Sequence, residues 1–162
     1  MIRKLLFGIL MTIGMAAQAD VTRHPLPNNS TFPISQAVEV TSDTVIIYHS
    51  GQLPAVADPD AEQGSREYYG DTETQALSVF KKFEASFEKL GVGFGDVVKM
   101  TVFLVGDPEL DGRMDFGGFM KAYVLYFGTE NQPNKPARSA FQIAGLARPN
   151  VFIEIEMVIA RP

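Results

Sequence analysis

Apolar side chains recur at helical spacing in the middle of the chain. They follow one another at intervals of 4, 3, 4 and 3 residues, at Ala76, Phe80, Phe83, Phe87 and Leu90. This spacing places them on one face of an α-helix. Thr72 with Gln75 three residues later has the pattern of a capping box, and Gly91 is typical of a helix end. The pattern predicts a helix that starts after a cap at Thr72, ends at Gly91 and packs one face against a core.

β-Branched and aromatic residues mark the strands. Residues 37–40 alternate in polarity, residues 44–48 are β-branched and aromatic, and a Ser-Asp turn at 42–43 between them predicts a hairpin. The remaining apolar segments predict strands at 97–105, 140–143 and 151–159 and a second helix at 114–127. The order ββαβαββ predicts an α+β domain in which two helices lie on one face of a mixed sheet.

Two segments lack such a pattern. Residues 20–35 contain three prolines and small polar residues, which favour an extended N-terminal arm ahead of a domain over residues 36–162. Residues 54–71 carry two prolines, two glycines and several acids, and they form a loop that is long for a compact domain. Such loops are often functional, so Tyr68 or Tyr69 either enters a binding cleft or lies on the surface.

The first nineteen residues have the pattern of a secretory signal peptide. Arg3 and Lys4 precede an uncharged apolar run over 5–16, and Ala-Gln-Ala at 17–19 offers small residues where a signal peptidase reads them. A membrane anchor is the alternative, but a spanning helix needs roughly 20 apolar residues. We therefore expect cleavage after Ala19, a periplasmic or secreted protein, and no membrane attachment after cleavage.

Composition excludes several classes of function. Without Arg3 and Lys4, 12 of the 14 basic residues remain against 19 acidic ones, a net charge of −7. This acidic balance argues against nucleic acid as a partner, because phosphate binding requires a basic surface. The chain has no Cys and only two His, which excludes disulfides, thiolate catalysis and a metal centre built from Cys or several His.

Two glutamates and one arginine are candidates for chemistry. Glu154 and Glu156 stand two residues apart in the last expected strand, so both side chains point to one face. Neighbouring carboxylates repel each other, and one of them should have a cationic partner or a raised pKa. Arg138, at the start of the preceding strand, is the nearest candidate for that partner. The alternatives are a solvated acidic strand face and an ordinary surface ion pair.

The adjacent pair His49 and Ser50 does not predict a hydrolase. Neighbouring residues of a strand point to opposite faces, so His49 is badly placed to activate Ser50 as a nucleophile.

Several motifs, in this order and spacing, resemble the RidA/YjgF family of reactive intermediate deaminases. Residues 136–140, Pro-Ala-Arg-Ser-Ala, followed by residues 151–156, Val-Phe-Ile-Glu-Ile-Glu, are similar to the C-terminal signature of the family. Other matching stretches are 50–54, Gln75 with Leu90-Gly91, and 96–103. The resemblance covers about residues 36–160. It implies a chorismate-mutase-like fold and a homotrimer with a cleft at each subunit interface.

The resemblance also implies a function. The best-studied members hydrolyse reactive enamines and imines, made by amino-acid dehydratases, to 2-oxo acids and ammonia. On this chain Arg138 would bind the substrate carboxylate, and Glu154 would hold the attacking water with help from the backbone carbonyl of Ala140. Ser50 and Gly51 would line the cleft. No metal or organic cofactor is expected, because the imine carbon is already electrophilic and needs only an oriented water.

The sequence departs from the family pattern at several positions. Ala140 replaces a Cys, the stretch 35–37 lacks a Tyr, and Met120 stands where the second helix of the family has an Asn. Export is also unusual, since the dehydratases that make these imines are cytosolic. Two alternatives follow: an exported enamine/imine deaminase for small carboxylates, and a non-catalytic trimer of the same fold that binds small carboxylates. Ribonuclease, a further label attached to the family, has no support from the charge or the two His.

Overall fold

The computed structural model of the chain describes residues 21–161, so the predicted signal peptide lies outside the described residues. The strands are β1 Val21–Pro25, β2 Ser35–Val40, β3 Val45–Gln52, β4 Val97–Asp107, β5 Arg113–Met114, β6 Ala137–Ile143 and β7 Ile153–Arg161. The helices are α1 Arg66–Tyr69, α2 Thr72–Leu90 and α3 Phe116–Tyr123, with 3-10 turns η1 Phe94–Asp96 and η2 Pro108–Leu110. None of the helices within residues 21–161 has the length and apolarity needed to cross a membrane.

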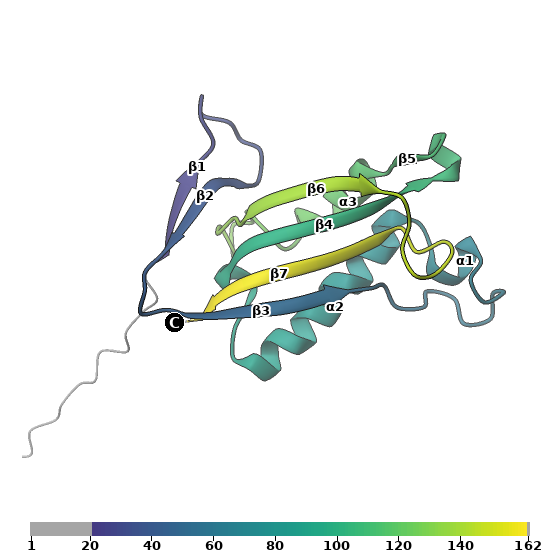
Figure 1. The fold of residues 1–162 in the computed structure, drawn as a ribbon, viewed down its shortest axis with the longest axis horizontal. Coiled ribbons are helices and arrows are strands. Elements are labelled where there is room, and N and C mark those ends of the chain that lie inside the picture. The colour runs from purple at the N-terminus through teal and green to yellow at the C-terminus, as the bar shows by residue number, and fades with distance from the viewer. Residues whose placement is uncertain (1–20, 162) are drawn as a thin grey trace, which may run out of the picture.

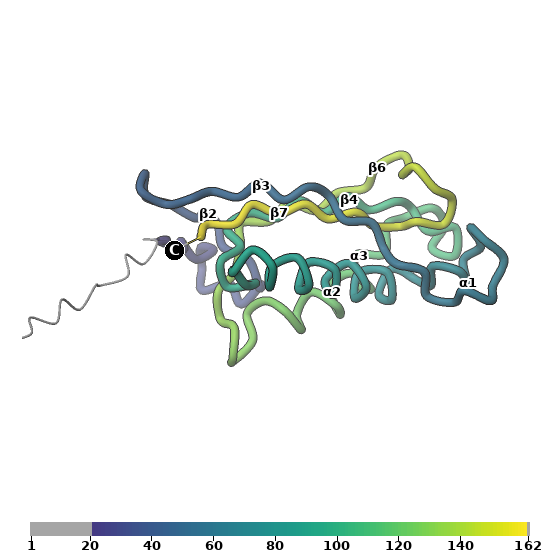
Figure 2. The backbone as a smooth tube through the Cα atoms, turned by 90° about the horizontal axis from the view of Figure 1, so that it is seen from below, coloured from purple at the N-terminus to yellow at the C-terminus, as the bar shows by residue number. Residues whose placement is uncertain are grey.

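The strands form one mixed sheet in the order β1-β2-β6-β4-β7-β3, with the short β5 paired to β4 (Figure 1). β4 lies between β6, which is parallel to it, and β7, which is antiparallel. The two longer helices, α2 and α3, lie along one face of the sheet, and no helix formed by residues 21–161 covers the opposite face (Figure 2). The predicted α+β architecture is therefore confirmed. We call the uncovered side the open face.

The core fills the space between the sheet and the two longer helices. The predicted apolar face of α2 packs here, and burial of each large side chain contributes about 1.5–3 kcal/mol. The largest fully buried side chains are Tyr123, Phe80, Phe83, Phe87, Phe119, Phe127, Met100, Leu104, Ile153, Ile155, Met157 and Ile159.

Helix α2 begins one residue earlier than the capping pattern predicted. The cap is Asp71, whose carboxylate accepts a hydrogen bond from the backbone N–H of Thr74 at 2.8 Å. The predicted cap, Thr72, is instead the first helical residue and is fully buried. Gly91 ends the helix in the left-handed conformation at φ 67°, as predicted.

The amide of Gln75 forms no capping box and bridges distant segments instead. Its nitrogen donates to the carbonyls of Gly70 at 2.9 Å and Asn150 at 2.8 Å. Its oxygen accepts from the N–H of Phe152 at 2.7 Å. A fully buried amide is stable only with such partners, so Gln75 joins the start of α2 to the segment that enters β7.

The predicted hairpin between the first two strands is wrong. β2 pairs instead with β1, from Val21 opposite Val40 to Pro25 opposite Ser35. β3 lies at the far edge of the sheet beside β7. The predicted arm thus contains a strand, β1, that serves as the partner of β2. Residues 21–40 form a two-stranded ribbon, which stands away from the rest of the sheet in Figure 1.

The second helix is shorter than predicted. α3 covers 116–123, Met114 belongs to β5, and the chain turns after Tyr123. Phe127 still reaches the core, where its ring stacks on that of Tyr123 with centroids 4.8 Å apart. A helical spacing of aromatic residues therefore continued past the end of the helix itself.

Candidate functional site

Arg138 lies on the helix-covered side of the sheet, among aromatic rings. It is the second residue of β6 and stands opposite Met100, which is fully buried in the core. The guanidinium carbon is 4.3 Å from the ring centroid of Tyr123 and 5.1 Å from that of Phe119. Phe32, from the link between β1 and β2, and Phe116 complete the surround at 5.4 and 5.6 Å. We call these four rings the aromatic wall.

The guanidinium of Arg138 has no acidic partner among residues 21–161. Within that range its N–H groups face Tyr123 and the sulfur of Met120, to which one of them donates at 3.2 Å. Burial lowers the pKa of Arg138 below its ordinary value, and the nearby Tyr123 opposes that effect. Aromatic faces attract a cation, but they leave most of its N–H donors without acceptors. The group is thus a positive charge, half-buried and prepared for an anion.

Tyr123 is fixed from the other side. Its hydroxyl donates to the backbone carbonyl of Pro33 at 2.7 Å, next to Phe32 in the chain. Burial raises the pKa of Tyr123, although Arg138 acts in the opposite sense, so the phenol stays protonated as a donor. The hydroxyl therefore positions the 26–34 link, and its ring supports the guanidinium.

Glu154 lies on the open face, beside Gly51. It stands opposite Phe103 of β4, which in turn pairs with the exposed Phe141 of β6. A Cβ atom placed on Gly51 would overlap the carboxylate of Glu154, with its Cδ 2.9 Å away. The carboxylate of Glu154 can therefore occupy this position only because residue 51 has no side chain. The two predicted cleft residues, Gly51 and Glu154, are in contact.

Arg138 and Glu154 do not meet within one chain. Arg138 aligns across β4 with Met157, so Glu154 is three residues along and two strands away, roughly 14 Å between Cα atoms. Their side chains also point to opposite faces. The predicted ion pair of Arg138 with Glu154 or Glu156 is therefore wrong, and the alternation of a strand is the reason.

The other two predicted cleft residues, Ala140 and Ser50, also lie in different parts of the sheet. Ala140 shares the helix-covered side with Arg138, two residues along β6, and packs against the core. Ser50 is exposed at an irregularity in β3, between the pairs that His49 and Gln52 form with β7. His49 binds the hydroxyl of Ser86 at 2.8 Å and the carbonyl of Ser50 at 2.9 Å, which agrees with its exclusion as a catalytic base.

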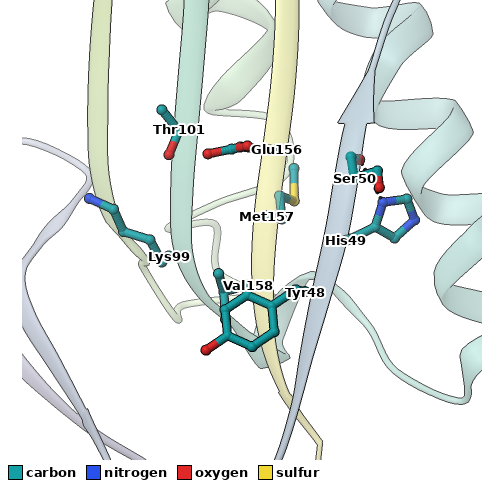
Figure 3. Close-up of a pocket in the computed structure, with 8 residues that line it drawn as sticks. All are labelled: Tyr48, His49, Ser50, Lys99, Thr101, Glu156, Met157 and Val158. Carbon is teal, nitrogen blue, oxygen red and sulfur yellow. Dashed lines mark hydrogen bonds between the residues drawn. The ribbon is translucent and has the colours of Figure 1, made fainter.

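Around Glu156 the open face forms a shallow hollow of about 220 Å³ (Figure 3). The carboxylate of Glu156 points across β4 toward Thr101, its partner in the register. Lys99 lies nearby and donates to the hydroxyl of Ser139 at 3.2 Å. Tyr48, 81% exposed, lies at the β3 side of the hollow.

The long loop is anchored by an ion pair that the sequence did not reveal. Both terminal nitrogens of Arg66 donate to the carboxylate of Asp107, at 2.7 and 2.9 Å. Asp107 is almost fully buried, and these bonds hold its pKa below the ordinary value. Tyr69 is buried and Tyr68 half-buried, at the opposite end of the sheet from the aromatic wall (Figure 1). Neither tyrosine reaches Arg138.

Within residues 21–161 no group of three or more His, Asp and Glu side chains is arranged to bind a metal ion. The candidate site consists of a half-buried arginine on one side of the sheet and a glutamate on the other. The class that the fold defines is an α+β domain with one mixed sheet and helices along one face.

Residues 22–161 match the family described as Endoribonuclease L-PSP, and the chain belongs to this family, the RidA/YjgF family. The resemblance seen in its motifs is thereby confirmed. A RutC family protein of Haemophilus influenzae is 32% identical over 129 residues, 80% of this chain and 87% of that protein. The 2-iminobutanoate/2-iminopropanoate deaminase of Salmonella typhimurium is 33% identical over 129 residues, 80% of this chain and 88% of its own length.

A solved structure agrees in fold. Escherichia coli TdcF with bound serine is 27% identical to this chain, with a TM-score of 0.55 over 82% of this chain and 91% of that one. The mixed sheet with helices on one face is common to both.

Proposed function

We propose that the protein is an exported deaminase that hydrolyses imines of small carboxylates to 2-oxo acids and ammonia. The observation that carries this proposal is the half-buried guanidinium of Arg138, which has no carboxylate partner within residues 21–161. Two relatives support it: one is named for imine deamination, and another, in its solved structure, carries serine, a small amino acid with a carboxylate.

In this proposal the working site lies between copies of the chain. Arg138 and Glu154 point to opposite faces of one sheet, so a ligand that touches both needs a glutamate from a second copy. A homotrimer provides such interfaces. The exposed apolar residues of the open face, among them Tyr48 and Phe141, supply surface for the association.

The chemistry requires few groups. Arg138 binds the substrate carboxylate by two parallel hydrogen bonds and fixes the imine carbon. Glu154 accepts a proton from a water, whose oxygen then bonds to that carbon as the C=N double bond becomes single. The proton passes to nitrogen and leaves a carbon that bears a hydroxyl and an amino group. The hydroxyl proton then also moves to the nitrogen, so that ammonia leaves as the carbon–nitrogen bond breaks and the carbon–oxygen bond becomes the carbonyl of the 2-oxo acid. The backbone carbonyl of Ala140 is proposed to help orient the water.

A non-catalytic trimer that binds small carboxylates is the second candidate. It is favoured by Met120, a thioether at the guanidinium where the family pattern has an amide, and by Ala140 in place of Cys. Turnover of freshly generated iminopyruvate separates the two candidates. A deaminase accelerates the release of pyruvate and ammonia, and Glu154→Gln abolishes the acceleration while 2-oxo acid binding survives. No acceleration by the intact trimer would leave the binding function alone.

Export is proposed from residues 1–19, which carry the signal-peptide pattern. Mass spectrometry of protein recovered from the envelope of a Gram-negative host should show Asp20 as the first residue. Full-length protein retained in the cytoplasm contradicts this part of the proposal.

A further inference from the structure

The surroundings of Arg138 carry information about the rest of the ligand. Two members of the aromatic wall, Phe119 and Tyr123, are fully buried and form a floor beneath the guanidinium. Phe116 is half-buried, Phe32 is 39% exposed, and the thioether of Met120 stands beside them. We call Phe32, Phe116 and Met120 the apolar rim. These three side chains are the more exposed part of the apolar surroundings of the guanidinium, so we expect a bound ligand to contact them.

The position of Phe32 is fixed by its neighbours. The carbonyl of the following residue, Pro33, accepts the hydrogen bond of Tyr123 at 2.7 Å. Ser35 is buried, and its N–H and hydroxyl bind the carbonyls of Pro136 and Lys135 at 3.0 and 2.7 Å. These bonds hold the end of the link against the start of β6, next to Arg138. These hydrogen bonds therefore fix the position of Phe32 beside Arg138.

In a ligand whose carboxylate binds Arg138, the atoms next to the carboxylate are expected to lie against the apolar rim. In a 2-oxo acid or its imine, the side chain begins one atom beyond the carboxyl-bearing carbon. Once the carboxylate binds the guanidinium, that side chain lies against the rim. Each methylene buried there raises affinity about fourfold, and an aromatic side chain gains further from contact with the rings. A methyl group is too small to use this surface.

We propose that the site selects carboxylates with an aromatic or branched apolar side chain, and that Phe32 is a specificity-determining residue. This inference rests on the proposed role of Arg138 as the carboxylate-binding group. The ligands proposed here have larger side chains than those expected from the sequence motifs. The reason is Phe32, a rim residue that belongs to the ribbon 21–40 and lies outside those motifs.

Titration calorimetry of the purified protein with three 2-oxo acids tests the proposal. We expect affinity to rise from pyruvate through 4-methyl-2-oxopentanoate to phenylpyruvate, by about tenfold or more across the series. Phe32→Ala should lower the affinity for phenylpyruvate about five- to tenfold and leave that for pyruvate within about twofold. The matched control is Leu110→Ala, which removes an apolar side chain of similar exposure, 38%, from the 3-10 turn η2 beyond the far end of β4.

Phe32→Leu is a second variant that keeps the test possible if Phe32→Ala does not fold. This variant keeps apolar bulk on the rim. Its affinity for 4-methyl-2-oxopentanoate should therefore be unchanged, and only its affinity for phenylpyruvate should fall. Equal affinity for all three acids in the natural protein, or an unchanged preference in the folded Phe32 variants, overturns the inference. If either of these results is obtained but Arg138→Ala still loses pyruvate binding, the proposed function stands and only the inference about Phe32 fails. Failure of every acid to bind the natural protein refutes both.

Discussion

The side chains of Arg138 and Glu154 leave the same sheet on opposite faces, with β4 between their strands. A chain of 162 residues therefore holds the proposed carboxylate-binding group and the proposed water-binding group where one small ligand cannot touch both. Since they belong to different faces, association of copies is the simple way to unite them. In the proposed homotrimer, association therefore serves the chemistry as well as the stability.

A mixing experiment tests whether two copies share a site. Arg138→Ala and Glu154→Gln should each be inactive toward imines, but oligomers refolded from an equal mixture should regain about a quarter of the sites. Each regained site would combine an intact arginine from one copy with an intact glutamate from another. Imine turnover is the readout, and sedimentation should give about three times the monomer mass. Activity no greater than that of the separate variants contradicts a shared site.

Replacement of Arg138 tests the geometry of binding as distinct from charge. A two-point bond from guanidinium to carboxylate contributes about 1.5–3 kcal/mol, or roughly 10- to 150-fold in Kd. Arg138→Lys retains the charge and loses the planar fork, so it should lose most of that affinity, nearly as much as Arg138→Ala. Calorimetric titration with 2-oxo acids and thermal melts of both variants make the comparison. Unchanged affinity in well-folded Arg138→Ala removes the site.

Gly51 offers a separate test of Glu154. In Gly51→Ala the new methyl group overlaps the carboxylate of Glu154, and the flexible end of that side chain must move. Displacement by about 1 Å costs on the order of 10²-fold in rate, while 2-oxo acid binding at Arg138 should hardly change. Gly145→Ala is the control, because a Cβ there meets no atom within 4 Å. Full imine turnover in Gly51→Ala speaks against a role for Glu154.

Asp107 should control stability in acid. Its pKa is lowered in the folded protein, chiefly by the hydrogen bonds from Arg66. Its contribution is thus complete well above the ordinary pKa of about 3.9 and is lost as pH falls through that value toward the folded pKa. Asp107→Asn should cost roughly 2 kcal/mol in urea unfolding at pH 7, and this difference should shrink on acidification. A difference that stays constant to pH 3 contradicts the assignment.

The second partner of Arg66 provides the matched control for that measurement. Glu109 lies 3.1 Å from the guanidinium but is 67% exposed. Solvent screens such a pair, so Glu109→Gln should change stability by no more than about 0.5 kcal/mol. Equal losses in the two variants would indicate that surface charge, and not the buried bond, stabilises the loop.

Local patterns predicted most of the fold. The aromatic spacing from Phe80 to Phe87 and the apolar runs of β4 and β7 depend only on neighbours in the chain, and they predicted the helix and both central strands. The alternation in β7 also placed Glu154 and Glu156 on one face correctly. What a segment forms by itself can be inferred from its own residues.

Pairings between distant segments could not be predicted in this way. A turn signal at 42–43 fits a hairpin, but the choice of partner for β2 depends on β1, whose Val-Thr-Arg-His-Pro sequence looks like a polar arm. The same limit hid the bond between Arg66 and Asp107, which lie 41 residues apart. It also hid the approach of Phe32 to Arg138. These contacts exist only once the sheet order is known.

The two ends of the sheet are held in different ways, and the buried amide of Gln75 holds one of them. It joins Gly70, Asn150 and Phe152, segments up to 77 residues apart, through one planar group that cannot rotate without breaking several bonds at once. One buried group therefore holds together the start of α2 and the segment that enters β7. At the other end, β2 pairs with β6 at Ser35 with Ala137, and the bonds of Ser35 and Tyr123 hold the link there. The place of Phe32 beside the arginine thus depends on a few bonds, whereas the glutamate lies in β7, which pairs with a strand on each side.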